Sequence, residues 1–216
     1  MVLPLFYEHR TLCGSVTFIE NKFLITAAHC FFNGDDTNPT LFPGNFYIGY
    51  QDKHVPLPEP LYRGFIPKAV TDNSCHVYTD IAFFRAPELL METGKSYILG
   101  ESDSLKFETP VELIGYCDDT SLSLVKLEGQ VINPAMATTN IKEHDPKKDY
   151  DNFMITFNNC FRVSNFICEN SSGGAIIHDN YCVGMIVFGT PPLIKPPGET
   201  VALKASHIRS LLNEYN

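Results

Sequence analysis

The sequence predicts an all-β protein, either a sandwich or a barrel. Short runs of β-branched and aromatic residues recur along the chain, and clusters of proline, glycine, asparagine and aspartate separate them. Helical periodicity is almost absent before the C-terminus, which argues against an α/β arrangement. Of the 216 residues, 44% are hydrophobic and 19% are charged, as in ordinary globular proteins. The chain is therefore expected to bury a core as a single domain over 1–216.

The strand signal is an apolar or aromatic run bounded by turn residues. Such runs lie at 16–19, 23–26, 46–50, 80–84, 111–115, 122–127, 153–157, 175–177 and 182–188. Two polar linkers between them, 20–22 and 178–180, have the length of hairpin turns. The first hairpin leads into His29, and the second begins just after Ser172-Gly173-Gly174. Both candidate reactive groups thus lie at strand ends, where loops on a rigid sheet usually present function.

One helix is predicted, at the C-terminal end of the chain over 206–214. Ser206 is a suitable N-cap, and Ile208, Leu211 and Leu212 have the i, i+3, i+4 spacing of a packed face. The polar stretch 134–151 is predicted as a long surface loop or an interdomain connection, and any boundary between two halves is expected near 100–110.

The charge and the apolar runs restrict the partners. A formal charge of −9 and a pI near 5.2 argue against nucleic acid, because phosphate binding depends on clustered lysine and arginine. The longest apolar runs fall well short of the ~20 residues that a membrane-spanning helix needs, so no membrane segment is expected. No basic segment precedes the apolar start of the chain, and a signal peptide is not evident.

The chain contains seven cysteines, which favour an oxidising compartment and therefore a secreted protein. Their odd number leaves at least one without a partner in the chain. No CxxC pair occurs at a zinc-finger spacing, so neither a metal nor another cofactor is expected. The cysteines are Cys13, Cys30, Cys75, Cys117, Cys160, Cys168 and Cys182.

Three residues far apart in the sequence form a candidate catalytic set. His29 ends the apolar run 24–28, and Asp80 begins a run otherwise too apolar to accept an unpaired carboxylate. Ser172 precedes two glycines, which allow a tight turn and the close approach of a substrate. Each residue alone has a simpler structural explanation. Together they supply a nucleophile, a general base and an acid that orients the base.

These stretches resemble the chymotrypsin family of serine peptidases, whose triad has the same order along the chain. The similar segments are LITAAHC at 24–30, TDIAFF at 79–84, SSGGA at 171–175 and VGMIVFG at 183–189. The separations of 51 and 92 residues between the three candidate residues also suit the family. The resemblance extends over roughly 11–212 and is thin outside these motifs.

The resemblance implies two six-stranded-type antiparallel barrels, over about 1–105 and 106–205, followed by the C-terminal helix. The active site would lie between them, with His29, Asp80 and Ser172 as the triad. Backbone N–H groups of Asn170 and Ser172 would form the oxyanion hole. Cys13-Gly14-Ser15 resembles the family's Cys-Gly-Gly, which implies a disulfide between Cys13 and Cys30. The implied activity is hydrolysis of proteins or peptides, by a monomer.

Several positions depart from the family pattern. Ser171 replaces the aspartate that normally pairs with a newly cut N-terminus, and no activation sequence precedes Cys13. Val187-Phe188-Gly189 replaces the Ser-Trp-Gly of the substrate strand, so a hydroxyl that supports Asp80 is missing. Phe166 stands where trypsin-like enzymes have their specificity carboxylate, so the pocket bounded by 166 and 187–189 is expected to be apolar or partly blocked.

Two hypotheses follow. The complete triad favours an active serine endopeptidase, whereas the changes at Ser171 and Val187 suit an impaired homologue that binds a protein partner on a peptidase scaffold. A structural or metal-binding β protein unrelated to peptidases would require all three motifs to be accidental.

Overall fold

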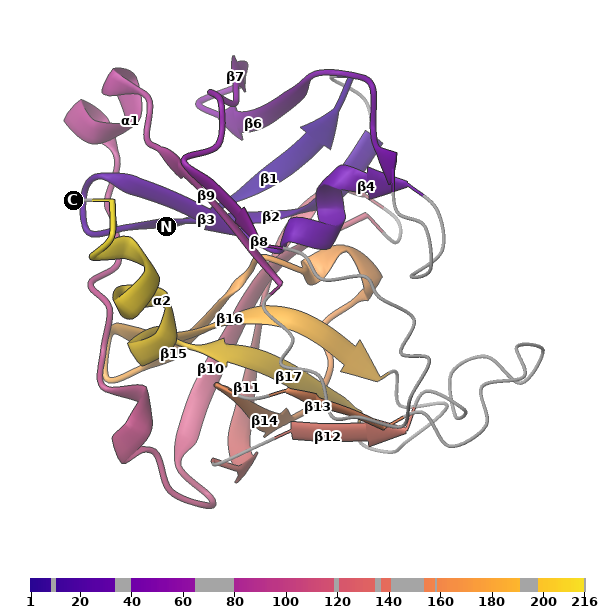
Figure 1. Ribbon diagram of the computed structural model, residues 1–216, viewed down its shortest axis with the longest axis vertical. Coiled ribbons are helices and arrows are strands. Elements are labelled where there is room, and N and C mark those ends of the chain that lie inside the picture. Colours follow the sequence, from indigo (N-terminus) through magenta and orange to yellow (C-terminus); the bar gives the residue numbers. More distant parts are fainter. Residues whose placement is uncertain are drawn as a thin grey trace.

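The fold was taken from a computed structural model of the chain. It describes residues 1–8, 11–33, 40–64, 80–118, 121–134, 137–140, 154–157, 159–190 and 198–215. Two antiparallel β units dominate these residues, and Figure 1 shows the N-terminal sheet above the C-terminal barrel, with the last helix beside the barrel. Within the described residues no helix is long and apolar enough to cross a bilayer.

The N-terminal unit is a seven-stranded sheet in the order β7-β6-β1-β2-β3-β9-β8. Two pairings join strands that are not consecutive: β6 pairs with β1, and β9 pairs with β3, which brings the segment after residue 79 back to the end of the first hairpin. The strands are β1 (Val2–Tyr7), β2 (Thr11–Ile19), β3 (Phe23–Thr26), β6 (Phe46–Tyr50), β7 (Lys53–Pro56), β8 (Tyr62–Gly64) and β9 (Ile81–Arg85).

The C-terminal unit is a closed barrel in the order β10-β11-β14-β17-β16-β15. Closure removes the free sheet edges of this unit. Its strands are β10 (Pro110–Cys117), β11 (Ser123–Asn133), β14 (Cys160–Ser164), β15 (Ala175–His178), β16 (Tyr181–Thr190) and β17 (Glu199–Lys204).

Short elements complete the described structure. The two-stranded sheets are β4 (Phe32–Asn33) with β5 (Thr40–Leu41), and β12 (Ala137–Asn140) with β13 (Met154–Phe157). The helices are α1 (Glu88–Thr93) and α2 (Ala205–Leu212), and the 3-10 turns are η1 (Ala28–Phe31), η2 (Ser102–Ser104) and η4 (Glu169–Ser171).

Apolar side chains from both units form the core. Aromatic and branched residues of the N-terminal sheet, such as Phe18, Leu24 and Phe84, are fully or almost fully buried. A second cluster joins the two units, because Ile25 of β3 belongs to the same buried group as Met185 of β16. This shared core holds β3 and β16 against one another. His29 follows β3, and Gly173, next to Ser172, bonds Ile186 in the middle of β16.

The predicted fold class is confirmed, since the chain is mainly antiparallel strand with a closed barrel, a second sheet and a C-terminal helix. Both predicted hairpins form. The first turns across 20–22 as predicted, whereas the second turns across 179–180, because His178 already pairs with Tyr181. The C-terminal helix begins one residue earlier than predicted, and Lys204 rather than Ser206 is its N-cap. Ser206 instead exchanges hydrogen bonds with Ser102. The predicted loop at 134–151 contains strand β12, and residues 141–150 lie outside the described part.

Candidate active site

His29 and Asp80 form a pair joined by two hydrogen bonds. The His29 backbone N–H donates to Asp80 Oδ1 at 2.8 Å, and His29 Nδ1 lies 2.5 Å from Asp80 Oδ2. The Asp80 side chain is fully buried, whereas the imidazole is 36% exposed. Asp80 thus orients the ring through Nδ1, so Nε2 is the nitrogen that can accept a proton from a nucleophile.

The sheet register explains why these two residues meet. Strand β3 pairs antiparallel with β9, with Thr26 opposite Ala82. His29 follows the end of β3 in turn η1, and Asp80 directly precedes β9. Residues just after one antiparallel strand and just before its neighbour lie at the same end of the sheet. A separation of 51 residues along the chain is closed in this way.

The environment raises the pKa of His29. Burial by itself lowers the pKa of the imidazole, but the Asp80 carboxylate and, to a lesser extent, Cys30 outweigh it and hold the pKa well above its ordinary value. The protonated ring is therefore favoured beside Asp80. This is the charge state that a general base acquires when it has taken a proton from a nucleophile.

Ser172 is attached to the N-terminal sheet through its backbone. Its carbonyl oxygen accepts a 2.7 Å hydrogen bond from the Ser15 N–H of β2. Gly14 touches both this carbonyl and the Cys30 thiol, since a Cβ on Gly14 would lie 3.0 Å from the first and 2.7 Å from the second. Gly14 therefore separates the Ser172 backbone from Cys30, the residue that follows His29. Within the described chain its hydroxyl makes no hydrogen bond to the imidazole.

Gly173 follows Ser172 and permits the sharp turn there. Its φ is +85°, and a Cβ at this position would lie 2.0 Å from the Ser15 carbonyl oxygen. Its carbonyl accepts from the Thr17 hydroxyl at 2.9 Å, and its N–H donates to Ile186 at 2.7 Å. Glycine is the residue that tolerates both the positive φ and this close approach. The loop after the candidate nucleophile is thus tied to both units.

The residues predicted for the oxyanion hole lie on the 3-10 turn Glu169–Ser171 and directly after it. Asn170 has φ −91° and ψ 19° within the turn, and Ser172 follows it with φ −52° and ψ 133°. Ser171, between them, is buried and bonds the Cys168 carbonyl through both its N–H and its hydroxyl, at 3.3 and 2.8 Å.

The residues predicted to contact substrate lie on β16 and before the turn. Phe166 packs its ring directly on Gly189, where a Cβ would come within 2.3 Å of the ring. Val187 is buried, and Phe188 packs partly buried against the shared core. The Phe166 ring thus occupies space beside the strand that contains Gly189.

The predicted disulfide between Cys13 and Cys30 is wrong, because both are free thiols. Cys13 Sγ lies 3.4 Å from the Leu5 carbonyl oxygen of β1, while Cys30 Sγ packs against Gly14. The disulfide that does form joins Cys117 to Cys168. Sequence reasoning left the pairing of these two open, and it missed the contacts of Ser15 and Thr17 with the serine loop.

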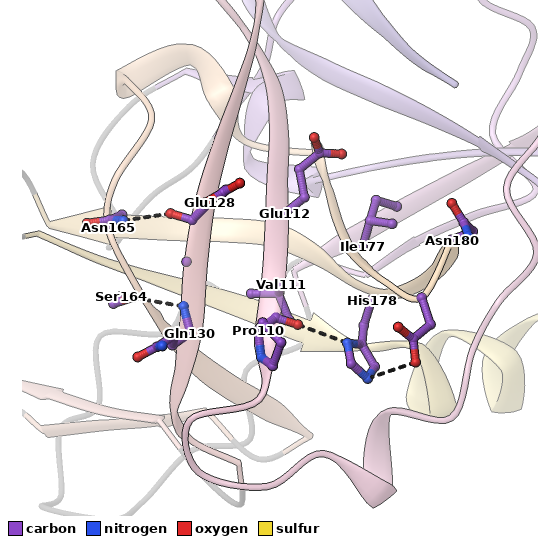
Figure 2. Close-up of a pocket in the computed structure, with 12 residues that line it drawn as sticks. Pro110, Val111, Glu112, Glu128, Gln130, Ser164, Asn165, Ile177, His178 and Asn180 are labelled. Carbon is purple, nitrogen blue, oxygen red and sulfur yellow. Dashed lines mark hydrogen bonds and ion pairs between the residues drawn. The ribbon is translucent and has the colours of Figure 1, made fainter.

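A separate hollow lies on the C-terminal barrel and holds none of the candidate catalytic residues. Figure 2 shows His178 bonded to the Pro110 carbonyl at 2.8 Å and Asn165 bonded to the Glu128 carbonyl at 2.7 Å along its walls. The described residues contain no group of three or more histidine, cysteine or acidic side chains placed to hold a metal ion.

Solved structures with a similar fold include a serine protease and a second protease. Neuropsin, expressed in the limbic system of mouse brain, superposes with a TM-score of 0.62 at 14% identity, over 99% of this chain and 93% of that one. The active form of the Rv3671c protease of M. tuberculosis gives 0.62 at 14% identity, over 98% and 79%. An inactive serine-to-alanine mutant of the same protease gives 0.59 at 14% identity, over 99% and 85%.

No curated protein sequence matches the chain significantly. The family model named Trypsin, however, matches residues 2–207, which is nearly the whole chain. This match agrees with the two antiparallel β units and with the fold of the solved proteases. The chain belongs to the trypsin family of serine peptidases.

Proposed function

We propose that the protein is a serine endopeptidase in which His29, Asp80 and Ser172 form the catalytic triad. The observation that carries this proposal is the buried carboxylate of Asp80, which bonds His29 at both the backbone and the ring. Burying a carboxylate without a partner costs free energy of folding, and the partner of Asp80 is the single imidazole of His29. The pair has the geometry that a general base needs, and the serine loop docks beside it through Ser15.

In the proposed mechanism Ser172 Oγ attacks the scissile carbonyl while His29 Nε2 accepts the hydroxyl proton. The C–N bond then breaks, His29 donates the proton to the leaving amine, and water hydrolyses the acyl-enzyme by the same proton path. Asp80 keeps the proton on Nδ1 and stabilises the imidazolium. The N–H groups of Asn170 and Ser172 bind the oxyanion, each contributing about 3–4 kcal/mol to the transition state.

The substrates proposed are proteins or peptides with a small or short apolar side chain on the acyl side of the cut bond. Phe166 rests on Gly189 and narrows the space between that strand and the serine loop. A carboxylate for binding arginine or lysine is absent at position 166. We propose that the protein acts outside the cell as a monomer and without a cofactor, in keeping with its disulfide.

A second candidate function is protein binding by an impaired homologue. The observation that favours it is the missing hydrogen bond between the Ser172 hydroxyl and the imidazole in the described residues. Catalytic hydrogen bonds are often long in peptidases without substrate and tighten in the complex, so this observation does not outweigh the His29 and Asp80 pair.

Peptide cleavage decides between the two functions. The purified chain is incubated with a peptide library, and the products are identified by mass spectrometry. We expect cleavage by the wild-type and none by Ser172→Ala, with unchanged cleavage by Ser123→Ala, which alters an exposed serine at the start of β11. Folded wild-type protein that cleaves nothing would support the binding function. Equal cleavage by wild-type and Ser172→Ala would show that Ser172 is not the nucleophile and would overturn the proposed triad.

A further inference from the structure

The Cys117–Cys168 disulfide lies at the base of the loop that carries Ser172. Cys168 is the N-cap of turn Glu169–Ser171, and Cys117 is the last residue of β10. The bond joins residues 51 apart in the sequence, and both cysteines are buried. The loop that precedes Ser172 is therefore fastened covalently to the rim of the barrel.

Ser171 closes this part of the loop on itself. Its hydroxyl and its N–H both bond the Cys168 carbonyl, and its Cβ lies against Gly115 of β10, where an added Cβ would come within 2.8 Å. Ser171 is 3% exposed, and its uncharged side chain cannot form an ion pair with another segment. In place of the aspartate expected from the family pattern, Ser171 thus makes a neutral contact to the disulfide residue.

The two ends of the loop are anchored differently. From Ser172 onward, hydrogen bonds from Ser15 and Thr17 of β2 and to Ile186 of β16 hold the backbone. From Phe166 to Ser171, the one polar contact of the described residues with another segment is made by the disulfide residue itself, whose Cys168 Sγ lies 3.5 Å from the Tyr116 carbonyl oxygen of β10. Apart from side-chain packing, the disulfide at Cys168 is the attachment of that half, which contains Asn170.

We propose that the Cys117–Cys168 disulfide positions the oxyanion loop, so that peptide hydrolysis requires the oxidised form and a dithiol reductant switches it off. This inference rests on the proposed peptidase function. Reduction cleaves the S–S bond with two electrons and two protons, giving two thiols while the dithiol becomes a cyclic disulfide. The half of the loop with Asn170 is then held only by packing, and its N–H loses its fixed direction.

The expected effect follows from what an oxyanion donor contributes. Loss of one donor lowers kcat by ~100- to 1,000-fold. Substrate binding depends mainly on β16, which the disulfide does not hold, and Phe166 keeps its packing on Gly189 of that strand, so KM changes little. A cross-link that served only global stability would instead lower the melting temperature without changing the kcat of the molecules that remain folded.

The test compares oxidised full-length protein with protein treated with dithiothreitol, below its melting temperature. Steady-state kinetics with a peptide substrate give kcat and KM, and hydrogen–deuterium exchange follows peptides from 166–172 and from β16. We expect the kcat to fall about 100-fold or more, with KM within about threefold, faster exchange in 166–172 and unchanged exchange in β16. Treatment of the double variant C117A/C168A, which already lacks the cross-link, is expected to change nothing further.

Ser171→Ala provides a second variant that keeps the disulfide and the fold. It is expected to lower kcat by roughly fivefold to tenfold through the lost hydrogen bond while keeping its sensitivity to dithiothreitol. Equal kcat and equal exchange in the two redox states would overturn the proposal, and so would faster exchange throughout β16, which would mark the disulfide as a general staple. If oxidised protein cleaves no peptide at all, the peptidase function fails instead, and the exchange data still report on the loop.

Discussion

Asp80 bonds His29 twice, once at the backbone N–H and once at the ring, so a single buried carboxylate sets both the position and the tautomer of the imidazole. The backbone bond orients turn Ala28–Phe31, and the ring bond orients the base. The serine loop is fixed independently, by β2, β16 and the Cys117–Cys168 disulfide. Catalysis in this account depends on two separately anchored parts meeting correctly.

Asp80→Asn should remove most of the activity while leaving the fold intact. The amide is nearly isosteric but donates to Nδ1, which moves the ring proton to Nε2 and prevents that nitrogen from accepting the serine proton. We expect kcat/KM to fall ~10,000-fold in steady-state assays. Asp103→Asn, which changes an exposed carboxylate paired with Lys204, is the matched control and should leave kcat/KM unchanged. A loss below tenfold for Asp80→Asn would contradict the assigned role.

The pH profile should reflect the raised pKa of His29. The base acts in its neutral form, so kcat/KM should rise with pH through an apparent pKa above the usual value of about 6.5. The carboxylate causes the shift, so Asp80→Asn should move the residual profile to lower pH. An acid limb centred below pH 6 in the wild-type would conflict with this geometry.

The same raised pKa predicts how His29 affects stability. The folded chain binds the proton more tightly than the unfolded chain does. The stabilisation from His29 is therefore fully present below about pH 6.5 and is lost as the pH rises through the folded-state value. Urea unfolding of wild-type and His29→Gln across this range should give a stability difference that shrinks with pH. A difference that grows with pH would have the wrong sign.

Phe166→Ala should widen the substrate preference. Removing the ring that rests on Gly189 opens space for a larger side chain. The ratio of kcat/KM for a substrate with phenylalanine to one with alanine before the cut bond should rise by about 10- to 200-fold. Phe107→Ala, at a phenylalanine that is 63% exposed, is expected to leave this ratio unchanged. An unaltered ratio in Phe166→Ala would place the specificity pocket elsewhere.

Gly173→Ala should abolish activity through the backbone. The added Cβ would collide with the Ser15 carbonyl at a φ of +85°, which displaces the loop that carries Ser172. Gly198→Ala is the control, because Gly198 has φ +94° just before β17 and lies outside the serine loop. Placing alanine at a positive φ has a backbone strain energy of about 1–3 kcal/mol in either variant. We expect both variants to lose melting temperature, Gly173→Ala more because its Cβ also meets backbone, and we expect loss of peptide cleavage in Gly173→Ala alone. Full activity in Gly173→Ala would show that the loop tolerates displacement.

Much of the fold was predictable because apolar runs and turn residues mark most strands directly. The strands that were missed carry weaker patterns. Strand β1 contains Pro4, which is unusual within a sheet, and β17 mixes Glu199, Thr200 and Lys204 with its apolar residues. The short helix α1 has no capping side chain at its N-terminus, and although Gly94 caps its C-terminus, six residues are too few for a helical pattern to stand out. Its packing against the N-terminal core places it.

The site divides in the same way. His29 and Asp80 were identifiable because each ends or begins an apolar run that does not otherwise accommodate it. The Cys13 and Cys30 pairing failed because it was transferred from a family pattern, whereas a disulfide depends on where the two side chains point. The roles of Ser15 and Thr17 depend on contacts between residues more than 150 apart, which no local pattern contains.

Reaction with a fluorophosphonate tests the triad most directly, since the reagent modifies a serine only when a base activates it. Intact-mass and peptide mass spectrometry of the folded, oxidised chain should show one adduct, on Ser172, and His29→Ala should show none under the same conditions. An unmodified Ser172 in the folded wild-type, or equal modification in His29→Ala, would contradict the account.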